Sequence, residues 1–253
     1  MVRSAIKANP KEKRKPEDNS PILHISELVY DTIQGEGITT GQPAVFLRTQ
    51  GCQINCFFCD SKEVWRKGNP YSVEELLHIF RKEGLMNKLM NNSYLVVTGG
   101  SPLLQQTALV ELFRRMRQRF NYLPKIEIEN ECVLLPNKSM IYFVHQWNNS
   151  PKLSNSGVKK ELRYKPEIIQ YTADQPNSFF KFVVKEEKDW NEIEKDFLKP
   201  KLIRKSQIIL MPEGGTRKEL YKRYKTIVNI ACREGVRMTD RLHIQIWNKA
   251  TGV

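Results

Sequence analysis

Residues 51–60 read Gly-Cys-Gln-Ile-Asn-Cys-Phe-Phe-Cys-Asp and place Cys52, Cys56 and Cys59 on one short loop. Three thiolates from one loop suit a cubane iron–sulfur cluster whose fourth iron has no protein ligand, whereas structural zinc sites and closed clusters usually have four ligands. Zinc is the main alternative for clustered cysteines, but its fourth ligand would be a histidine or a distant cysteine, and none lies nearby. We therefore expect an iron–sulfur centre with one iron open to another molecule.

Strands and helices alternate on both sides of this loop. Apolar or alternating runs predict strands at residues 24–30, 44–48, 94–97, 125–130, 140–144, 179–184, 207–212 and 241–247. Helices are expected at residues 72–81, 109–116, 190–197 and 216–235, the first of them with a capping box from Ser72 to Glu75. Such alternation implies parallel strands joined by right-handed crossovers. The expected fold is therefore α/β, a barrel or part of one. Roughly six or seven of these strands would form the core, fewer than the eight of a closed barrel, which favours a partial, open TIM-like β/α barrel.

The cysteine loop directly follows the expected strand at residues 44–48. It would then lie at the C-terminal end of a parallel strand, where β/α barrels carry their chemistry. This position favours a reactive centre over a purely structural one.

Two segments lie outside the alternating pattern. Residues 1–21 are rich in basic residues and poor in apolar ones, a composition that predicts a mobile basic arm. Residues 153–178 are polar and lysine-rich with little periodicity, which predicts an insertion or a long surface loop. The rest of residues 22–253 is expected to form one domain.

Charge and composition narrow the class of protein. The 253 residues carry a formal net charge of +13, from 41 Lys and Arg against 28 Asp and Glu. This charge suits a nucleic acid, an anionic substrate or simply a basic surface, but no nucleic-acid-binding motif accompanies it, so nucleic acid is not expected as a direct partner. Five cysteines, three of them clustered, indicate a reducing compartment, and no apolar run is long enough for a membrane span or a signal peptide. We expect a cytoplasmic protein.

Three polar motifs are candidates for a binding site. In residues 32–37, Gly35 separates Gln34 from Glu36, and such a bend could present both side chains to a ligand, although an ordinary hairpin loop is the alternative. Residues 99–100 are two glycines after a strand, which either expose backbone groups to a ligand or make a plain tight turn. His243 shares one face of the last expected strand with Gln245, and a substrate role and a structural role are equally open.

In this order the motifs resemble those of radical S-adenosylmethionine enzymes and, more narrowly, of the 7-carboxy-7-deazaguanine synthase family. The resemblance covers most of the chain from about residue 24. It rests on residues 32–37 (TIQGEG), 51–60 with Trp65, 98–100 (TGG), 150–152 (SPK), 181–184 (KFVV), 210–214 (LMPEG) and 243–247 (HIQIW). It implies a barrel of the radical S-adenosylmethionine type.

The resemblance also implies a cofactor set. Cys52, Cys56 and Cys59 would hold a [4Fe–4S] cluster, with S-adenosylmethionine on its open iron. Residues expected to line the cofactor site are Phe58, Gly99, Gly100, Ser101, Glu129, Ser150 and Lys152. Ser61 would bind Mg²⁺ in place of the more usual threonine, and either hydroxyl is a hard oxygen donor.

The substrate implied by the resemblance is 6-carboxy-5,6,7,8-tetrahydropterin, which the family converts to 7-carboxy-7-deazaguanine with loss of ammonia, in queuosine-type biosynthesis. Residues expected to hold it are Gln34, Glu36, Arg48, Thr98 and His243. The Arg48 guanidinium can bind a carboxylate through two parallel hydrogen bonds. The family further implies a flavodoxin-like electron donor and a homodimer.

Two departures from the family pattern stand out. The superfamily motif Gly-Gly-Glu-Pro is Gly-Gly-Ser-Pro at residues 99–102, so the Ser101 hydroxyl replaces a carboxylate that would receive the methionine ammonium, and Glu129 is a candidate to compensate. The motif Glu-Thr-Asn-Gly is Glu-Asn-Glu-Cys at residues 129–132.

Two other functions share part of this pattern. An activase that generates a glycyl radical on a partner protein would share the cysteine loop, but it has no use for residues 32–37 or for His243. A non-catalytic zinc or iron–sulfur protein that binds nucleic acid is favoured only by the net charge.

Overall fold

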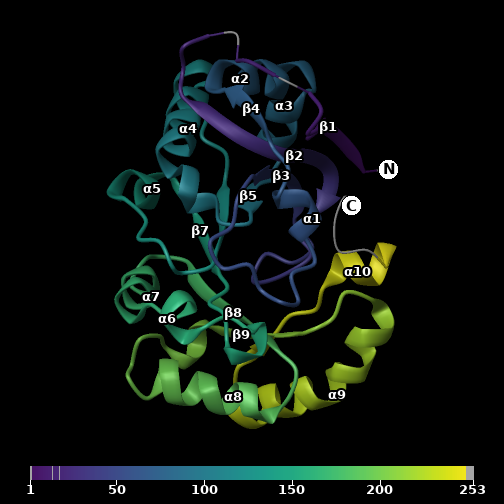
Figure 1. Cartoon of the computed structure of the whole chain (residues 1–253), viewed down its shortest axis with the longest axis vertical. Helices are drawn as coiled ribbons and strands as arrows, with labels where there is room; N and C mark the ends of the chain where they lie inside the picture. Colours follow the sequence, from purple (N-terminus) through teal and green to yellow (C-terminus); the bar gives the residue numbers. More distant parts are fainter. Residues whose placement is uncertain (1, 13, 17, 249–253) are drawn as a thin grey trace.

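The computed structural model describes residues 2–12, 14–16 and 18–248, and Figure 1 shows the chain with one sheet running through its length. Its strands are β1 (Arg3–Lys7), β2 (Ile22–Ile33), β3 (Pro43–Thr49), β4 (Asn69–Ser72), β5 (Tyr94–Gly99), β6 (Ile126–Asn130), β7 (Gln146–Asn149), β8 (Ser178–Val184), β9 (Ile208–Pro212) and β10 (Arg237–Met238). The sheet order is β1-β2-β3-β5-β6-β7-β8-β9-β10, with β4 paired to β2.

The helices are α1 (Lys62–Trp65), α2 (Val73–Lys82), α3 (Leu85–Met90), α4 (Gln106–Phe120), α5 (Lys138–Phe143), α6 (Lys160–Arg163), α7 (Pro166–Ala173), α8 (Glu187–Ile193), α9 (Arg217–Glu234) and α10 (Leu242–Trp247). Short helical turns are η1 (Pro102–Gln105), η2 (Ser154–Ser156), η3 (Glu194–Leu198) and η4 (Lys205–Gln207). None of the described helices combines the length and the apolar character that a membrane span requires.

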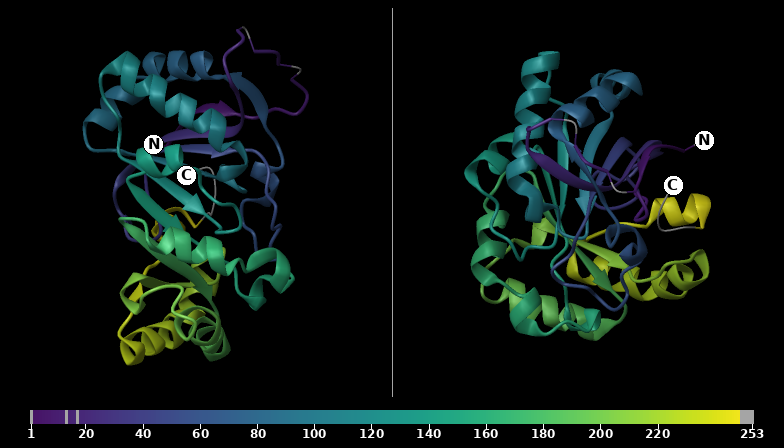
Figure 2. Two further views of the ribbon diagram at one scale, coloured as in Figure 1. Left: turned by 90° about the vertical axis from the view of Figure 1, so that its left-hand side faces the viewer. Right: turned by 45° about the horizontal axis from the view of Figure 1, so that its top comes forward.

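The strands from β3 to β10 are parallel to their neighbours, whereas β1, β2 and β4 pair antiparallel at one edge. The edge strands β1 and β10 do not pair with each other in the sheet order, so the barrel stays open. Figure 2 shows the curved sheet with helices outside it. The expected open β/α barrel is confirmed.

Two apolar cores hold the helices to the sheet. The first contains side chains from β2 to β7 packed against α2, α3 and α4, and the second contains side chains from β8 and β9 packed against α7, α8 and α9. The capping box that starts α2 is confirmed, because Ser72 Oγ accepts a hydrogen bond from the Glu75 amide at 3.1 Å and Glu75 Oε2 accepts one from the Ser72 amide at 2.7 Å. The predicted helix at residues 216–235 is confirmed as α9.

The predicted strand at residues 140–144 is wrong, because this segment belongs to helix α5. The Asn137 side chain accepts a hydrogen bond from the Met140 amide at 2.8 Å and caps the helix. Met140 and Phe143, three residues apart, are both buried, so the apolar run serves a helical face. The strand at this point of the chain is β7, which begins at Gln146, three residues after helix α5 ends.

The predicted strand at residues 241–247 is also wrong, because Leu242–Trp247 forms helix α10. The parallel sheet has already ended with β10, which pairs with β9. The Arg217 side chain donates hydrogen bonds to the carbonyl oxygens of Gln245 and Ile246, both at 2.7 Å, and so satisfies two acceptors at the end of the helix. The alternation of polar and apolar residues in so short a segment did not distinguish a strand from a helix.

Described parts of the two segments that were set aside in the sequence form elements of the fold. The expected mobile arm is wrong for Arg3–Lys7, which pairs with β2 as strand β1 and buries Ile6 in the first core. Residues 1, 13 and 17 of the arm lie outside the described residues. The expected insertion at residues 153–178 is mostly the helical crossover from β7 to β8, in which α7 buries Ile169 against the second core.

Candidate functional site

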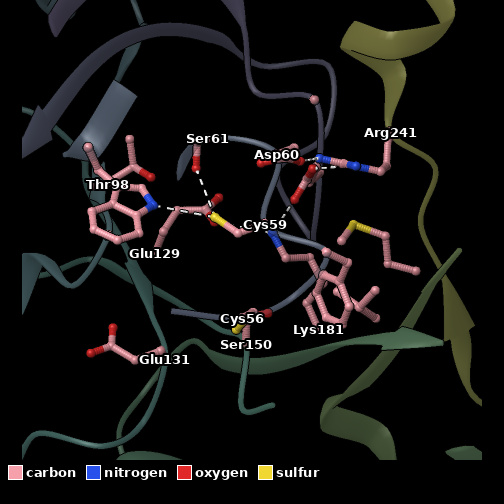
Figure 3. Close-up of a pocket in the computed structure, with 18 of the residues that line it drawn as sticks. Cys56, Cys59, Asp60, Ser61, Thr98, Glu129, Glu131, Ser150, Lys181 and Arg241 are labelled. Atoms are coloured by element: carbon pink, nitrogen blue, oxygen red, sulfur yellow. Dashed lines mark hydrogen bonds and ion pairs between the residues drawn. The ribbon is translucent and has the colours of Figure 1, made fainter. Parts of the chain in front are cut away.

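A cavity of about 440 Å³ opens at the C-terminal ends of the parallel strands. Every residue predicted for the site lines it, with the exception of Ser101. Ser101 is fully buried and reaches the cysteine loop, because its Oγ accepts a hydrogen bond from the Gln53 amide at 3.3 Å. Figure 3 shows Cys56 and Cys59 together with charged side chains of this cavity. The fold thus brings together residues that lie far apart in the sequence.

The cysteine loop is held from two sides. The Ser101 amide donates a hydrogen bond to the Gly51 carbonyl at 2.8 Å, and the Phe57 amide donates one to the Ser156 carbonyl at 2.9 Å. Gly100 lies so close to the loop that a Cβ there would be 2.2 Å from the Gly51 carbonyl oxygen. Only glycine fits this position, so the close approach of β5 to the loop explains one of the two glycines.

The three thiols have surroundings that suit thiolate ligands. The Asn55 amide donates to Cys52 Sγ, and Trp65 Nε1 donates to Cys59 Sγ, both at 3.4 Å. Burial raises the pKa of Cys56, and the positive charge of Lys152 opposes this shift. In the described parts of the chain no three His, Cys, Asp or Glu side chains are arranged around a single ion. The hydrogen bonds to Cys52 and Cys59 stabilise the thiolate charge that cluster ligands carry.

A network of buried charges forms another part of the cavity wall. Glu36 accepts hydrogen bonds from Lys181 Nζ at 2.6 Å and from Arg241 Nε at 2.7 Å. Lys181 also donates to Glu129 at 3.2 Å, and Arg241 also donates to Asp60. Burial alone would raise the pKa of Glu36, but the two cations hold it well below its usual range. Burial opposes the charge on Lys181, but Glu129 and Glu36 raise its pKa above the ordinary value.

Glu127 lies beneath this network and is fully buried. It accepts hydrogen bonds from Gln34 Nε2 at 2.5 Å, from Asn148 Nδ2 at 3.1 Å and from the Thr39 hydroxyl. Burial and the nearby charge of Glu129 raise the pKa of Glu127 to about 7. Gln34 also donates to Glu129 at 3.1 Å, so this predicted substrate ligand connects the two carboxyl groups.

Arg48 and His243 reach the cavity from opposite ends of the chain. Arg48 Nε donates to Glu27 Oε1 at 2.7 Å, which fixes the guanidinium at the cavity wall. His243 packs on Gly35, where a Cβ would be 2.0 Å from Nδ1. His243 Nε2 lies 3.8 Å from Glu36 Oε1, and burial lowers the pKa of the imidazole. His243 therefore lies in the site although it is on a helix rather than on the strand expected for it.

Other predicted residues lie around the cysteine loop. Lys152 Nζ donates to the carbonyl oxygen and the hydroxyl of Ser150, at 2.5 and 2.9 Å. Ser61 Oγ lies 3.8 Å from Cys59 Sγ, and Phe58 lies on the loop itself. Thr98 and Gly99 end strand β5 at the cavity.

Sequence reasoning missed the roles of Lys181, Arg241 and Glu131 in the cavity wall. Lys181 carried a signal, because a single charge inside an apolar strand is buried only when it has partners. Arg241 carried no such signal in the sequence, because its partners Glu36 and Asp60 are about two hundred residues away. Glu131 was noted only as a departure from a motif.

The chain is similar to known proteins over most of its length. A family model described as a 4Fe-4S single cluster domain matches residues 33–128. The 7-carboxy-7-deazaguanine synthase of Pyrobaculum aerophilum is 35% identical over 236 residues, covering 92% of this chain and 98% of that protein. The enzyme of the same name from Halobacterium salinarum is 30% identical over 254 residues, covering 92% and 93%. The crystal structure of QueE from Escherichia coli has a similar fold, with a TM-score of 0.65, 21% identity and coverage of 88% and 95%.

Proposed function

The chain belongs to the 7-carboxy-7-deazaguanine synthase family, and from this premise we propose that it is a radical S-adenosylmethionine enzyme. The reaction is the conversion of 6-carboxy-5,6,7,8-tetrahydropterin to 7-carboxy-7-deazaguanine with loss of ammonia, a step of queuosine-type biosynthesis. The observation that carries the proposal is a single cavity lined both by the three cysteines and by the Glu36–Lys181–Arg241 network. Cofactor and substrate would share this enclosure.

The cofactor end of the cavity is the cysteine loop. Cys52, Cys56 and Cys59 would hold a [4Fe–4S] cluster, as the amide and indole donors to two of their sulfurs support. When bound, the cluster and S-adenosylmethionine supply a 5′-deoxyadenosyl radical, which no side chain can generate. Gly99 and Ser150 line the same cavity, where they would contact the cofactor.

The substrate end would be the charge network. Carboxylates such as Glu129 can accept hydrogen bonds from the N–H groups of a pterin ring. Arg48 would bind the substrate carboxylate, because Glu27 holds its Nε and none of the described residues engages its other nitrogens. Thr98 adds a hydroxyl at the end of β5. Burial lowers the pKa of His243, which favours the neutral imidazole at this end of the site.

Further ligands and partners belong to the same proposal. Mg²⁺ would bind at the Ser61 hydroxyl, and because it prefers six oxygen ligands it would take the others from water and substrate. A flavodoxin-like protein would donate the electron. The enzyme would act as a homodimer in the cytoplasm.

Anaerobic reconstitution tests the proposal. The chain loaded with iron and sulfide is expected to absorb broadly in the visible range and, given the carboxypterin, S-adenosylmethionine and a reductant, to release 7-carboxy-7-deazaguanine, identified by mass. The Cys56→Ala variant should lose both the absorption and the product. A correctly loaded chain that makes no product would refute the proposal, and zinc without iron in the purified protein would favour a non-catalytic metal protein.

A further inference from the structure

Arg163 is a buried cation outside the wall of the cavity. It ends the short helix α6, is only 4% exposed, and has its Nη1 2.9 Å from Glu192 Oε1. A buried guanidinium is costly unless acceptors replace its hydration, and one carboxylate cannot occupy all five of its N–H donors. The acceptors that take its other donors therefore show what Arg163 stabilises.

The other hydrogen bonds of Arg163 go to the backbone of residues 152–158. Nη1 donates to the Lys152 carbonyl oxygen at 2.9 Å, and Nε donates to the Val158 carbonyl oxygen at 3.1 Å. These carbonyl groups lie at the two ends of the segment, so one planar side chain sets the distance between them. The fixed donor geometry of a guanidinium suits this arrangement.

Glu192, on helix α8, holds the middle of the same segment. Each of its oxygens lies 3.0 Å from the Ser154 amide nitrogen and accepts its hydrogen bond, and Oε2 also accepts one from the Ser154 hydroxyl at 2.5 Å. Because Glu192 is also the carboxylate beside Arg163, the ion pair contacts residues 152–158 at their start, middle and end.

Residues 152–158 in turn contact the cysteine loop. The Ser156 carbonyl oxygen accepts the hydrogen bond from the Phe57 amide at 2.9 Å. Val158 packs against the small apolar cluster that contains Ile54 and Cys56. A displacement of the segment would therefore also move the loop that carries the three cysteines.

Lys152 extends from the same segment into the cavity. Its side chain lines the cavity, where its positive charge lowers the pKa of Cys56 against the effect of burial. Its Nζ is bound to Ser150, and its own carbonyl oxygen is bound to Arg163. The position of the segment therefore also sets the position of a charge that acts on one of the cysteines.

We propose that Arg163 and Glu192 are positioning residues for the iron–sulfur cluster, because they fix residues 152–158 and, through them, the cysteine loop. The assignment rests on the proposed function, to which the cluster belongs. Neither side chain lines the cavity, so neither is a catalytic residue. A purely structural ion pair between α6 and α8 would affect the stability of the chain but not the properties of a bound cluster.

Arg163→Lys tests the proposal because it keeps the charge and removes the planar set of donors. One ammonium cannot reproduce the hydrogen bonds to two carbonyl oxygens together with the contact to Glu192. After anaerobic reconstitution, the variant should lose iron to a chelator at least fivefold faster than the parent, as followed by its visible absorption. The electron paramagnetic resonance spectrum of its reduced cluster should also differ from the parent's, since the cysteine loop and Lys152 would lie differently around the cluster.

Arg115→Lys is the matched control. Arg115 donates to Glu111 and Glu74, both at 2.5 Å, on the helices α4 and α2 that cover the first core. The substitution is the same and also disturbs contacts with carboxylates, but it leaves residues 152–158 untouched. This variant should match the parent in both the rate of iron loss and the spectrum.

Glu192→Gln tests the other member of the pair. An amide has one oxygen instead of two and no charge, so it weakens the contacts with both Ser154 and Arg163. This variant should lose iron at least threefold faster than the parent. The double variant should lose iron no more than twofold faster than the faster single variant, because residues that act as one unit have non-additive effects.

Each outcome has a distinct meaning. Parent-like iron loss and a parent-like spectrum in Arg163→Lys would overturn the positioning role and leave the proposed function standing. The same holds if the effects of the single variants multiply in the double variant, or if Arg115→Lys loses iron as fast as Arg163→Lys. If Arg163→Lys does not fold, the rate and the spectrum of Glu192→Gln decide instead. A parent that binds no iron–sulfur cluster would overturn the proposed function itself.

Discussion

Lys181 shows, at the scale of the residue, how this site tolerates buried charge. It is only 1% exposed in the middle of an apolar strand, and its ammonium donates to Glu36 and Glu129. A buried ion is stable only when partners replace its hydration, and here each carboxylate that does so also lines the cavity. Lys181, Glu36 and Glu129 neutralise one another in the free protein. Because all three line the cavity, they can also contact a polar substrate there.

Arg48 gives the first prediction. Its guanidinium keeps its planar donors in place through the hydrogen bond to Glu27, and lysine cannot reproduce two parallel hydrogen bonds to a carboxylate. Arg48→Lys should raise KM for the carboxypterin by about tenfold or more, since two charge-assisted hydrogen bonds become one. Iron content should not change. Glu27→Gln, which keeps the guanidinium, should raise KM less, and an Arg48→Lys enzyme with the parent's KM would show that Arg48 does not bind the substrate.

Glu127 gives a prediction about pH and stability. Its folded-state pKa of about 7 lies above the ordinary value of 4.5, so between these pH values the folded chain binds more protons than the unfolded chain. The contribution of Glu127 to stability is therefore present below pH 4.5 and is lost as the pH rises through 7. Glu127→Gln mimics the protonated acid and should be more stable than the parent above pH 7, by about 3 kcal/mol.

Urea unfolding of the cluster-free chain at pH 5 and pH 8 measures this difference. The increase in the free energy of unfolding of Glu127→Gln over the parent should be much larger at pH 8 than at pH 5. The exposed-site control Glu194→Gln should show no such difference between the two pH values. A gain that does not depend on pH would contradict the assigned titration.

At the scale of the element, the cysteine loop depends on the loop after β5. Gly100→Ala would place a methyl group 2.2 Å from the Gly51 carbonyl oxygen and 2.4 Å from Cys52 Cβ, so the cysteine loop must shift. The variant should retain less than about half of the parent's iron after reconstitution and lose about 1–3 kcal/mol of unfolding free energy, as overpacked sites do. Gly215→Ala is the matched control, because its Cβ would meet nothing closer than 3.7 Å. Full iron loading of Gly100→Ala would contradict this packing.

The elements differ in how far their sequences determine them. Helix α2 could be predicted because its cap and its apolar face agree, and α9 because its apolar face extends over several turns. The structures of residues 140–144 and 241–247 could not be predicted, since a short apolar run suits either a strand or a helix. Their structures are decided by contacts outside the segment, such as the cap from Asn137 and the hydrogen bonds from Arg217.

At the scale of the whole molecule, the open barrel and the place of the cysteine loop followed from local patterns alone. The ion pairs of the charge network could not be predicted from local patterns. Glu36 contacts Lys181 and Arg241 only because the topology of the sheet brings these distant residues together. Candidate site residues such as Gln34 and His243 were proposed from motif order, and the fold places them together in one cavity although His243 lies on an unexpected helix.

In the proposed reaction, hydrogen would be taken from C6 of the carboxypterin, which one cavity would bring to the cofactor held by the cysteines. The most direct measurement is anaerobic turnover of substrate deuterated at C6, followed by mass analysis of both products. We expect 5′-deoxyadenosine to carry the deuterium and 7-carboxy-7-deazaguanine to form with it. Cleavage of S-adenosylmethionine by the loaded enzyme in the presence of this substrate, with neither deuterium transfer nor the deazaguanine, would contradict it.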